Sequence, residues 1–187
     1  MGARRHLILI QSWTVVACLG AAYAPAGAAA DAVEPSQPTA VEAGPASAWP
    51  CRLLVANELL PRVQIVWERS ATFRQQCARL ARAGALVFLR TATSVQIQRP
   101  AQSRIGVSAD GVTVAHVLVR LSADTVEHIG HEFEHVLEYV EKVNLRETLA
   151  HHRSGVTESG VGYETDRAVD AGMRVAREVR DSRRRQR

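Results

Sequence analysis

The sequence predicts an α+β fold in which a small sheet packs on helices. The apolar run at 85–91 (ALVFLRT) fits a buried strand. The pair Asp110–Gly111 stands between two apolar segments, which is typical of a hairpin turn. Residues 123–143 repeat apolar side chains at helical spacing. Because these segments alternate along one chain of 187 residues, we expect a single domain of mixed helices and strands.

The expected elements follow one another along the chain. They are a short helix at 53–60, a helix at 70–83, a strand at 85–91, a loop at 98–103, a hairpin formed by 105–108 and 112–121, a helix at 123–143, helical turns at 145–151, a glycine-rich loop up to 162 and a last helix at 163–180.

Proline, glycine and apolar spacing define the first half. Pro61 is expected to end or interrupt the first helix. Phe73, Cys77 and Leu80 share one face of the second helix, and Gly84 stands where a C-cap is needed.

Breakers and caps define the second half. Pro100 predicts the loop after the strand. Ser122 is the expected N-cap of the long helix. Gly155, Gly160 and Gly162 predict the loop before the last helix.

Residues 1–30 are typical of an export signal. A basic start precedes an apolar stretch at 7–22, and 26–28 and 28–30 both satisfy an A-x-A cleavage pattern. The sequence thus predicts an exported bacterial protein, periplasmic or secreted. Two other outcomes stay open, both of which attach the chain to a membrane: an uncleaved signal as an anchor, or a lipoprotein acylated at Cys18, since 15–18 (VVAC) is similar to a lipobox.

Composition divides the remainder into a linker, a domain and a tail. Residues 31–49 contain three prolines and no apolar periodicity, which predicts a disordered linker. The folded domain is expected at 50–181, with a basic tail at 182–187. No aromatic residue lies among the tail arginines, so a nucleic-acid partner is not expected. The sequence leaves open the oligomeric state and whether Cys51 and Cys77 pair.

The segment 131–135 (HEFEH) has the H-E-x-x-H pattern. Residues four apart lie on one face of a helix, so His131 and His135 can both reach one Zn²⁺ ion. Glu132 points to the flank of that face, from which it can take a proton from water rather than bind the metal. The pattern predicts a zinc site with Glu132 as general base.

The rest of this helix divides into two faces. The apolar residues from Val126 to Val140 fall within one arc, whereas His128, Glu134 and Glu138 cluster around His131. The histidines therefore face either a cleft or bulk water. The alternative to a metal site is a solvated face that happens to be rich in His and Glu.

These residues resemble those of the zincin metallopeptidases, and of the gluzincin branch in particular. The resemblance implies a minimal zincin-like domain in which a C-terminal helix carries a glutamate as third ligand. Residues 162–168 (GYETDRA) are similar to that stretch in small secreted bacterial zincin-like proteins. Glu164 matches the third ligand, with Glu158 and Asp166 as alternatives. Glu134 departs from the pattern, because the family prefers an uncharged residue there, and it could crowd the site.

Three further residues are candidates for supporting roles. Glu138 could accept a hydrogen bond from a ligand imidazole, His128 could lie behind the ligands, and Tyr163 could stabilise an oxyanion. The resemblance also implies that the strand at 112–121 borders the cleft and pairs with extended substrate.

The resulting hypothesis is an exported zinc metallopeptidase that hydrolyses peptide or protein substrates. Water activated by zinc would attack the peptide carbonyl with the assistance of Glu132. The alternative is a non-catalytic, zincin-shaped zinc-binding or interaction module of the cell envelope.

Overall fold

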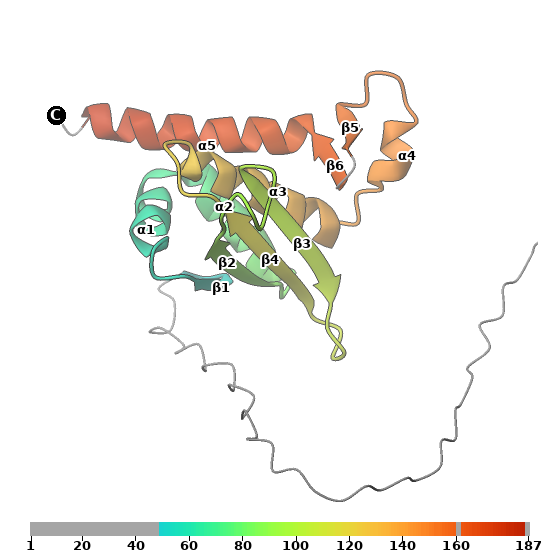
Figure 1. Cartoon of the computed structure of the whole chain (residues 1–187), viewed down its shortest axis with the longest axis horizontal. Coiled ribbons are helices and arrows are strands. Elements are labelled where there is room, and N and C mark those ends of the chain that lie inside the picture. The colour runs from blue at the N-terminus through green and yellow to red at the C-terminus, as the bar shows by residue number, and fades with distance from the viewer. Residues whose placement is uncertain (1–48, 160–161, 186–187) are drawn as a thin grey trace, which may run out of the picture. The chain divides into compact units, whose positions relative to one another are not determined.

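The structure is a computed structural model that describes residues 49–159 and 162–185 (Figure 1). The predicted export signal at 1–30, its Cys18 and the linker up to residue 48 lie outside the described residues. Among the helices that are described, none is long and apolar enough to span a bilayer.

Helices and strands alternate along the chain, which confirms the α+β class. The elements are β1 (Arg52–Val55), α1 (Leu60–Arg69), α2 (Ala71–Arg82), β2 (Leu86–Thr91), β3 (Ala101–Val107), β4 (Thr113–Val119), α3 (Thr125–Val140), α4 (Leu145–Leu149), β5 (Val156–Ser159), β6 (Gly162–Thr165) and α5 (Asp166–Arg185).

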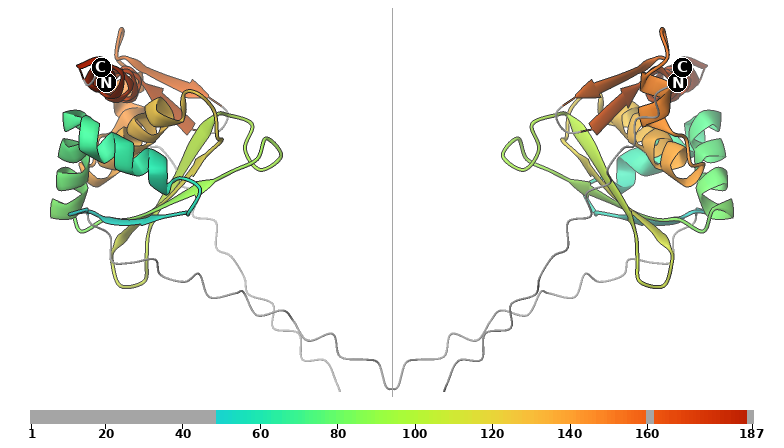
Figure 2. Two further views of the ribbon diagram at one scale, coloured as in Figure 1. Left: turned by 90° about the vertical axis from the view of Figure 1, so that its left-hand side faces the viewer. Right: turned by 90° about the vertical axis from the view of Figure 1, so that its right-hand side faces the viewer.

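Four strands form a sheet in the order β1-β2-β4-β3. β1, β2 and β4 run parallel, and β3 pairs antiparallel with β4 through the predicted hairpin. Helices α1, α2 and α3 lie on one face of the sheet (Figure 2). Inward side chains such as Val87 and Val117 meet Phe73 and Phe133 in the core between these layers. The sheet and α3 therefore pack against each other through this shared core.

The prediction for residues 53–60 is wrong. Residues 52–55 form strand β1, in which Leu53 is buried and pairs with Val87 of β2. Pro61 does not end a helix but stands in the first turn of α1, where its fixed φ and missing N–H are tolerated. Because a proline at this place was expected to end a helix, α1 was not predicted.

The second helix, the strand after it and the hairpin are confirmed. Ser70 caps α2 by accepting from the N–H of Phe73, and Gly84 after the helix has φ +67°. Strand β3 begins at Ala101, directly after Pro100, so it takes in residues for which a loop was predicted. Ser122 is not the cap of α3, because the N-cap position falls at Asp124.

The C-terminal part departs from prediction at its start and at its end. The expected glycine-rich loop contains strands β5 and β6, which pair as an antiparallel hairpin. Helix α5 begins only at Asp166 and continues to Arg185, beyond the expected end at Arg180.

Helices α3 and α5 pack closely along their length (Figure 1). Two glycines permit this approach. A Cβ added at Gly130 would lie 2.7 Å from Val175, and one added at Gly172 would lie 2.8 Å from the carbonyl oxygen of Glu127. The small residues set the height of α5 above the helix that carries the H-E-x-x-H motif.

Cys51 and Cys77 form a disulfide, with their Cα atoms 5.1 Å apart. Both cysteines are buried. The bond ties the start of β1 to α2, and so resolves the pairing that the sequence left open.

Candidate metal centre

Three predicted ligands meet at one point above α3. The Nε2 atoms of His131 and His135 are 3.2 Å apart. Oε1 of Glu164 lies 3.2 Å from the first and 3.5 Å from the second. Atoms that share one tetrahedral zinc at about 2.0–2.1 Å stand about 3.3 Å from one another. The three atoms thus have the spacing of one face of a zinc tetrahedron, and these residues fit the ion.

Of the three acidic candidates for the third ligand, Glu164 is the one that lies beside the two histidines. It lies on β6, two residues before α5, rather than on the C-terminal helix that the resemblance implies. Of the two alternatives, Glu158 and Asp166 are both exposed, and neither belongs to a group of potential ligands in the described part of the chain.

Glu138 holds the second histidine in place, as predicted. Nδ1 of His135 is 2.9 Å from Oε2 of Glu138. A carboxylate can only accept, so Nδ1 donates and the lone pair of Nε2 stays free for a metal. Oε1 of Glu138 accepts from the Thr165 hydroxyl at 2.7 Å. That hydroxyl also accepts from the N–H of Ala168. One carboxylate therefore links His135 to the junction between Glu164 and α5.

Burial and neighbouring charges shift the protonation of these groups. Burial lowers the pKa of His131. Burial also lowers the pKa of His135, but the hydrogen bond to Glu138 and nearby carboxylates outweigh it and raise this pKa overall. For Glu138, burial raises the pKa, and the hydrogen bonds from His135 and Thr165 lower it by more. A neutral His131 is the form that binds a metal.

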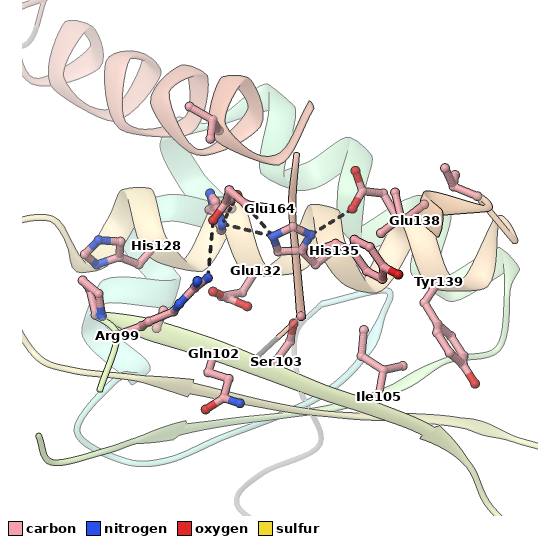
Figure 3. A pocket seen from close by; sticks show the side chains of 18 of the residues that line it. Arg99, Gln102, Ser103, Ile105, His128, Glu132, His135, Glu138, Tyr139 and Glu164 are labelled. Carbon is pink, nitrogen blue, oxygen red and sulfur yellow. Dashed lines mark hydrogen bonds and ion pairs between the residues drawn. The ribbon is translucent and has the colours of Figure 1, made fainter. Parts of the chain in front are cut away.

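Glu132 lies beside the three ligand atoms without joining them (Figure 3). It is only 5% exposed. Burial raises the pKa of Glu132, and the charge of His135 and the side chain of Ser103 counteract this only in part. A raised pKa suits a carboxylate that must accept a proton and then release it.

Glu134 does not crowd the site, which removes the doubt that its charge raised. It is buried and turns from the cleft toward α2 and α5. Oε2 accepts from Gln76 at 2.8 Å, and Oε1 accepts from Arg167 at 2.7 Å and Arg79 at 3.3 Å. The expectation that Glu134 shares the face of His131 is therefore wrong.

The ligands stand in a cleft between α3 and strand β3 (Figure 3). Its volume of about 680 Å³ lies in the range of small-molecule and cofactor sites. β4, which was expected to border it, pairs on both sides, with β2 and β3. The strand at the edge is β3, and its Gln102, Ser103 and Ile105 line the cleft.

The remaining candidates lie at the rim or elsewhere. His128 and Tyr163 line the cleft but do not join the ligand group. No hydrogen bond of the described residues assigns either of them an oxyanion role. Their predicted roles stay predictions.

Sequence reasoning missed several residues around the site. Arg99 has Nη1 3.9 Å from Oε2 of Glu164. Ser103 lies beside Glu132, and Thr165 orients Glu138. Arg99 and Ser103 reach the site from β3 and the loop before it, so no local spacing pointed to them. Thr165 carried a weak signal, because threonine is a preferred N-cap residue near the start of a helix.

Comparisons with protein-family models, with curated proteins and with solved structures found no match to this chain.

Proposed function

We propose that this protein is a zinc-dependent peptidase. The observation that carries the proposal is the triangle of Nε2, Nε2 and Oε1 atoms beside the buried Glu132, in a cleft that an edge strand borders. A solvated His and Glu face would not need ligands that come from two separate elements to converge at zinc spacing.

The chain supplies each function that peptide hydrolysis requires. His131, His135 and Glu164 would hold zinc, which when bound supplies a Lewis acid that polarises water and a carbonyl group. Glu132 would accept the proton of the attacking water and pass it to the departing amine. Glu138 would hold the ring of His135, and Thr165 would hold Glu138.

The edge strand supports a peptide as the substrate. β3 pairs with β4 on one side only, so the backbone groups of its other side can bond an extended chain. Such pairing would carry the peptide past Glu132, since Ser103 of β3 lies beside this carboxylate.

The predicted export signal and the Cys51–Cys77 bond together support a site of action outside the cytoplasm. The substrate would then be an extracytoplasmic peptide or protein.

Metal content tests the proposal first. We expect about one zinc per chain in the purified full chain, by elemental analysis, and none in the His131→Ala/His135→Ala variant. A wild-type chain that stays free of zinc after reconstitution would refute the proposal. Zinc without hydrolysis of any peptide in a random library would leave the alternative, a zinc-binding module.

A further inference from the structure

The two ends of the cleft differ in chemistry (Figure 3). Arg99, Gln102 and His128 line one end. Four apolar or aromatic side chains line the other, Ile105, Tyr139, Val143 and Leu145, together with the exposed Asn144 and Arg146 that neighbour them in the chain. The ligand triangle and Glu132 lie between these ends, so a peptide that crosses the site would contact both.

The apolar end presents large side chains to solvent. Tyr139 is 43% exposed and Val143 is 37% exposed, although both stand at the wall of a cleft. They come from the end of α3 and the connection to α4, and Ile105 faces them from β3 (Figure 3). An apolar side chain bound between them would remove this surface from water, which favours binding.

The opposite end carries Arg99, the arginine that lies beside the ligand triangle. The Arg99 side chain is 40% exposed, and its guanidinium points toward Glu164 across the cleft. At 3.9 Å this pair lacks the short, two-pronged contact that arginine forms with a full carboxylate partner. The guanidinium therefore keeps donors free for a carboxylate of a ligand.

The direction of β3 orders these contacts along a peptide. The strand runs from the Arg99 end, at Ala101, to the apolar end, past Ile105. A peptide added antiparallel, the pairing that is slightly more stable per residue, would run the opposite way. Its N-terminal part would lie at Tyr139 and its C-terminal part at Arg99.

We infer that the cleft selects peptides with a large apolar side chain on the N-terminal side of the ligand triangle and a carboxylate on the C-terminal side. The inference rests on the proposed function for its choice of a peptide as ligand. The carboxylate belongs to an acidic side chain or to the free C-terminus of the peptide, two sources of the same chemistry.

Peptide binding to the zinc-loaded full chain with Glu132→Gln tests the inference, because this variant does not consume the ligand. Four peptides with an N-terminal fluorophore are compared by anisotropy: Gly-Phe-Ala-Ala-Glu-Gly-amide, the same peptide with Gln for Glu, Gly-Phe-Ala-Ala-Gln with a free carboxylate, and the reversed Gly-Glu-Ala-Ala-Phe-Gly-amide. We expect the Gln amide and the reversed peptide to bind about tenfold more weakly than the first. The third peptide identifies the source: binding equal to the first shows that a free C-terminus serves as well as a side chain, and weak binding assigns the side chain alone.

Further variants, each combined with Glu132→Gln, test which end of the cleft is responsible for each preference. Arg99→Gln should remove the preference for a carboxylate, whereas Arg104→Gln, an exposed arginine of β3 outside the cleft, should keep it. Tyr139→Ser should remove the preference for Phe over Ala at the apolar position, measured with the first peptide and with a fifth peptide in which Ala replaces Phe. Leu54→Ser is its control, because Leu54 is also 43% exposed and lies outside the cleft.

Equal binding of all four peptides, or preferences that survive Arg99→Gln and Tyr139→Ser, would overturn the inference. Tighter binding of the reversed peptide would overturn it too, because it would reverse the direction. Failure of the inference and failure of the proposed function can be told apart: hydrolysis without such preferences leaves a peptidase of another specificity, and the preferences without hydrolysis leave a peptide-binding cleft that is not an enzyme.

Discussion

Two glutamates of the H-E-x-x-H segment are equally buried and have opposite surroundings. Glu132 and Glu134 are each 5% exposed. Glu134 faces α2 and α5, where Gln76, Arg79 and Arg167 donate to its two oxygens. Glu132 faces the cleft, and no ion pair of the described residues includes it.

The difference shows how one helix separates stability from chemistry. A buried carboxylate stabilises a fold only if charges and donors replace the water it has lost. Glu134 has these partners, which join three helices. Glu132 forms no ion pair with the described residues, so its burial costs stability and leaves a candidate base with a raised pKa beside the candidate ligands. We expect substitutions on the two sides of α3 to have effects of different kinds.

The largest expected effect is on catalysis. Glu132→Gln should lower kcat about 10³-fold, because the proton acceptor is lost. Glu134→Gln should stay within about tenfold of wild type, because its side chain does not reach the cleft. Steady-state hydrolysis of a fluorogenic peptide, with zinc content measured for each variant, checks this. Equal losses in the two variants would refute the division.

The second largest expected effect is on stability: removal of metal should lower the free energy of unfolding. Zinc that binds only the folded state, at 1,000 times its Kd, adds about 4 kcal/mol to the free energy of unfolding. Urea denaturation with and without chelator measures this difference. It should vanish in His131→Ala/His135→Ala and persist in Glu134→Gln. A wild-type chain that is indifferent to chelator would argue for a solvated helix face.

Loss of the partnered carboxylate should weaken the fold itself. Glu134→Ala should lower the free energy of unfolding by about 2 kcal/mol in the presence of chelator. The value is below the roughly 3–5 kcal/mol expected for a fully buried pair, because Arg79 and Arg167 remain 33% and 37% exposed and can turn to water. A change under 0.5 kcal/mol in chemical denaturation would contradict the structural role of this network.

A methyl group added between α3 and α5 should affect both the stability of the fold and zinc binding. Gly172→Ala would place a Cβ 2.8 Å from the backbone oxygen of Glu127 and 3.0 Å from Cβ of His131. We expect a loss of about 1–2 kcal/mol despite the better helix propensity of alanine, together with weaker zinc binding, because α5 and Glu164 must shift. Gly106→Ala, with no atom within 4 Å of the new Cβ, is the control. Calorimetric zinc titration and denaturation test the pair.

The smallest expected effect concerns a carboxylate far from the cleft. Burial raises the pKa of Glu178, but hydrogen bonds from Ser70 and Thr72 at the start of α2 outweigh it and lower this pKa overall. Its stabilisation is therefore present above the unfolded pKa of about 4.3 and is lost as the pH falls through the folded value.

Glu178→Gln should thus cost about 1 kcal/mol at pH 7, and the difference from wild type should fade toward pH 3. Unfolding curves with chelator present, taken from pH 7 to pH 3, measure it. A difference that does not change with pH would exclude the charge of Glu178 as the cause.

Local geometry explains which parts of the site could be predicted. Helix periodicity alone brings His131 and His135 together and sets Glu132 beside them. Glu164 needed a resemblance, because no spacing relates it to α3. Arg99 was missed, since only the pairing of β3 with β4 brings the preceding loop to the cleft.

Similar limits explain which predictions of the fold were wrong. Residues 53–55 are a short apolar run, which periodicity cannot assign to helix or strand. Their strand forms because β2 offers partners 34 residues later, as in the pair Leu53 and Val87. The position of Glu134 on the inner flank of α3 depended on where α5 packs, and helix-wheel angles could not show this.

The disulfide has a consequence for the order in which the protein matures. Cys51 and Cys77 are 26 residues apart and enclose β1, α1 and the first half of α2, whereas the proposed zinc ligands His131, His135 and Glu164 all follow in the sequence. Closing a loop of this length restricts the unfolded chain by about 3–4 kcal/mol. The loop contains Gln76, which holds the carbonyl of Gly130 and the carboxylate of Glu134. We expect the disulfide to form before metal binds. In a reducing compartment, a newly made chain would hold α2 less firmly against α3, the helix with the H-E-x-x-H motif. Such a chain would stay inactive until Cys51 and Cys77 are oxidised.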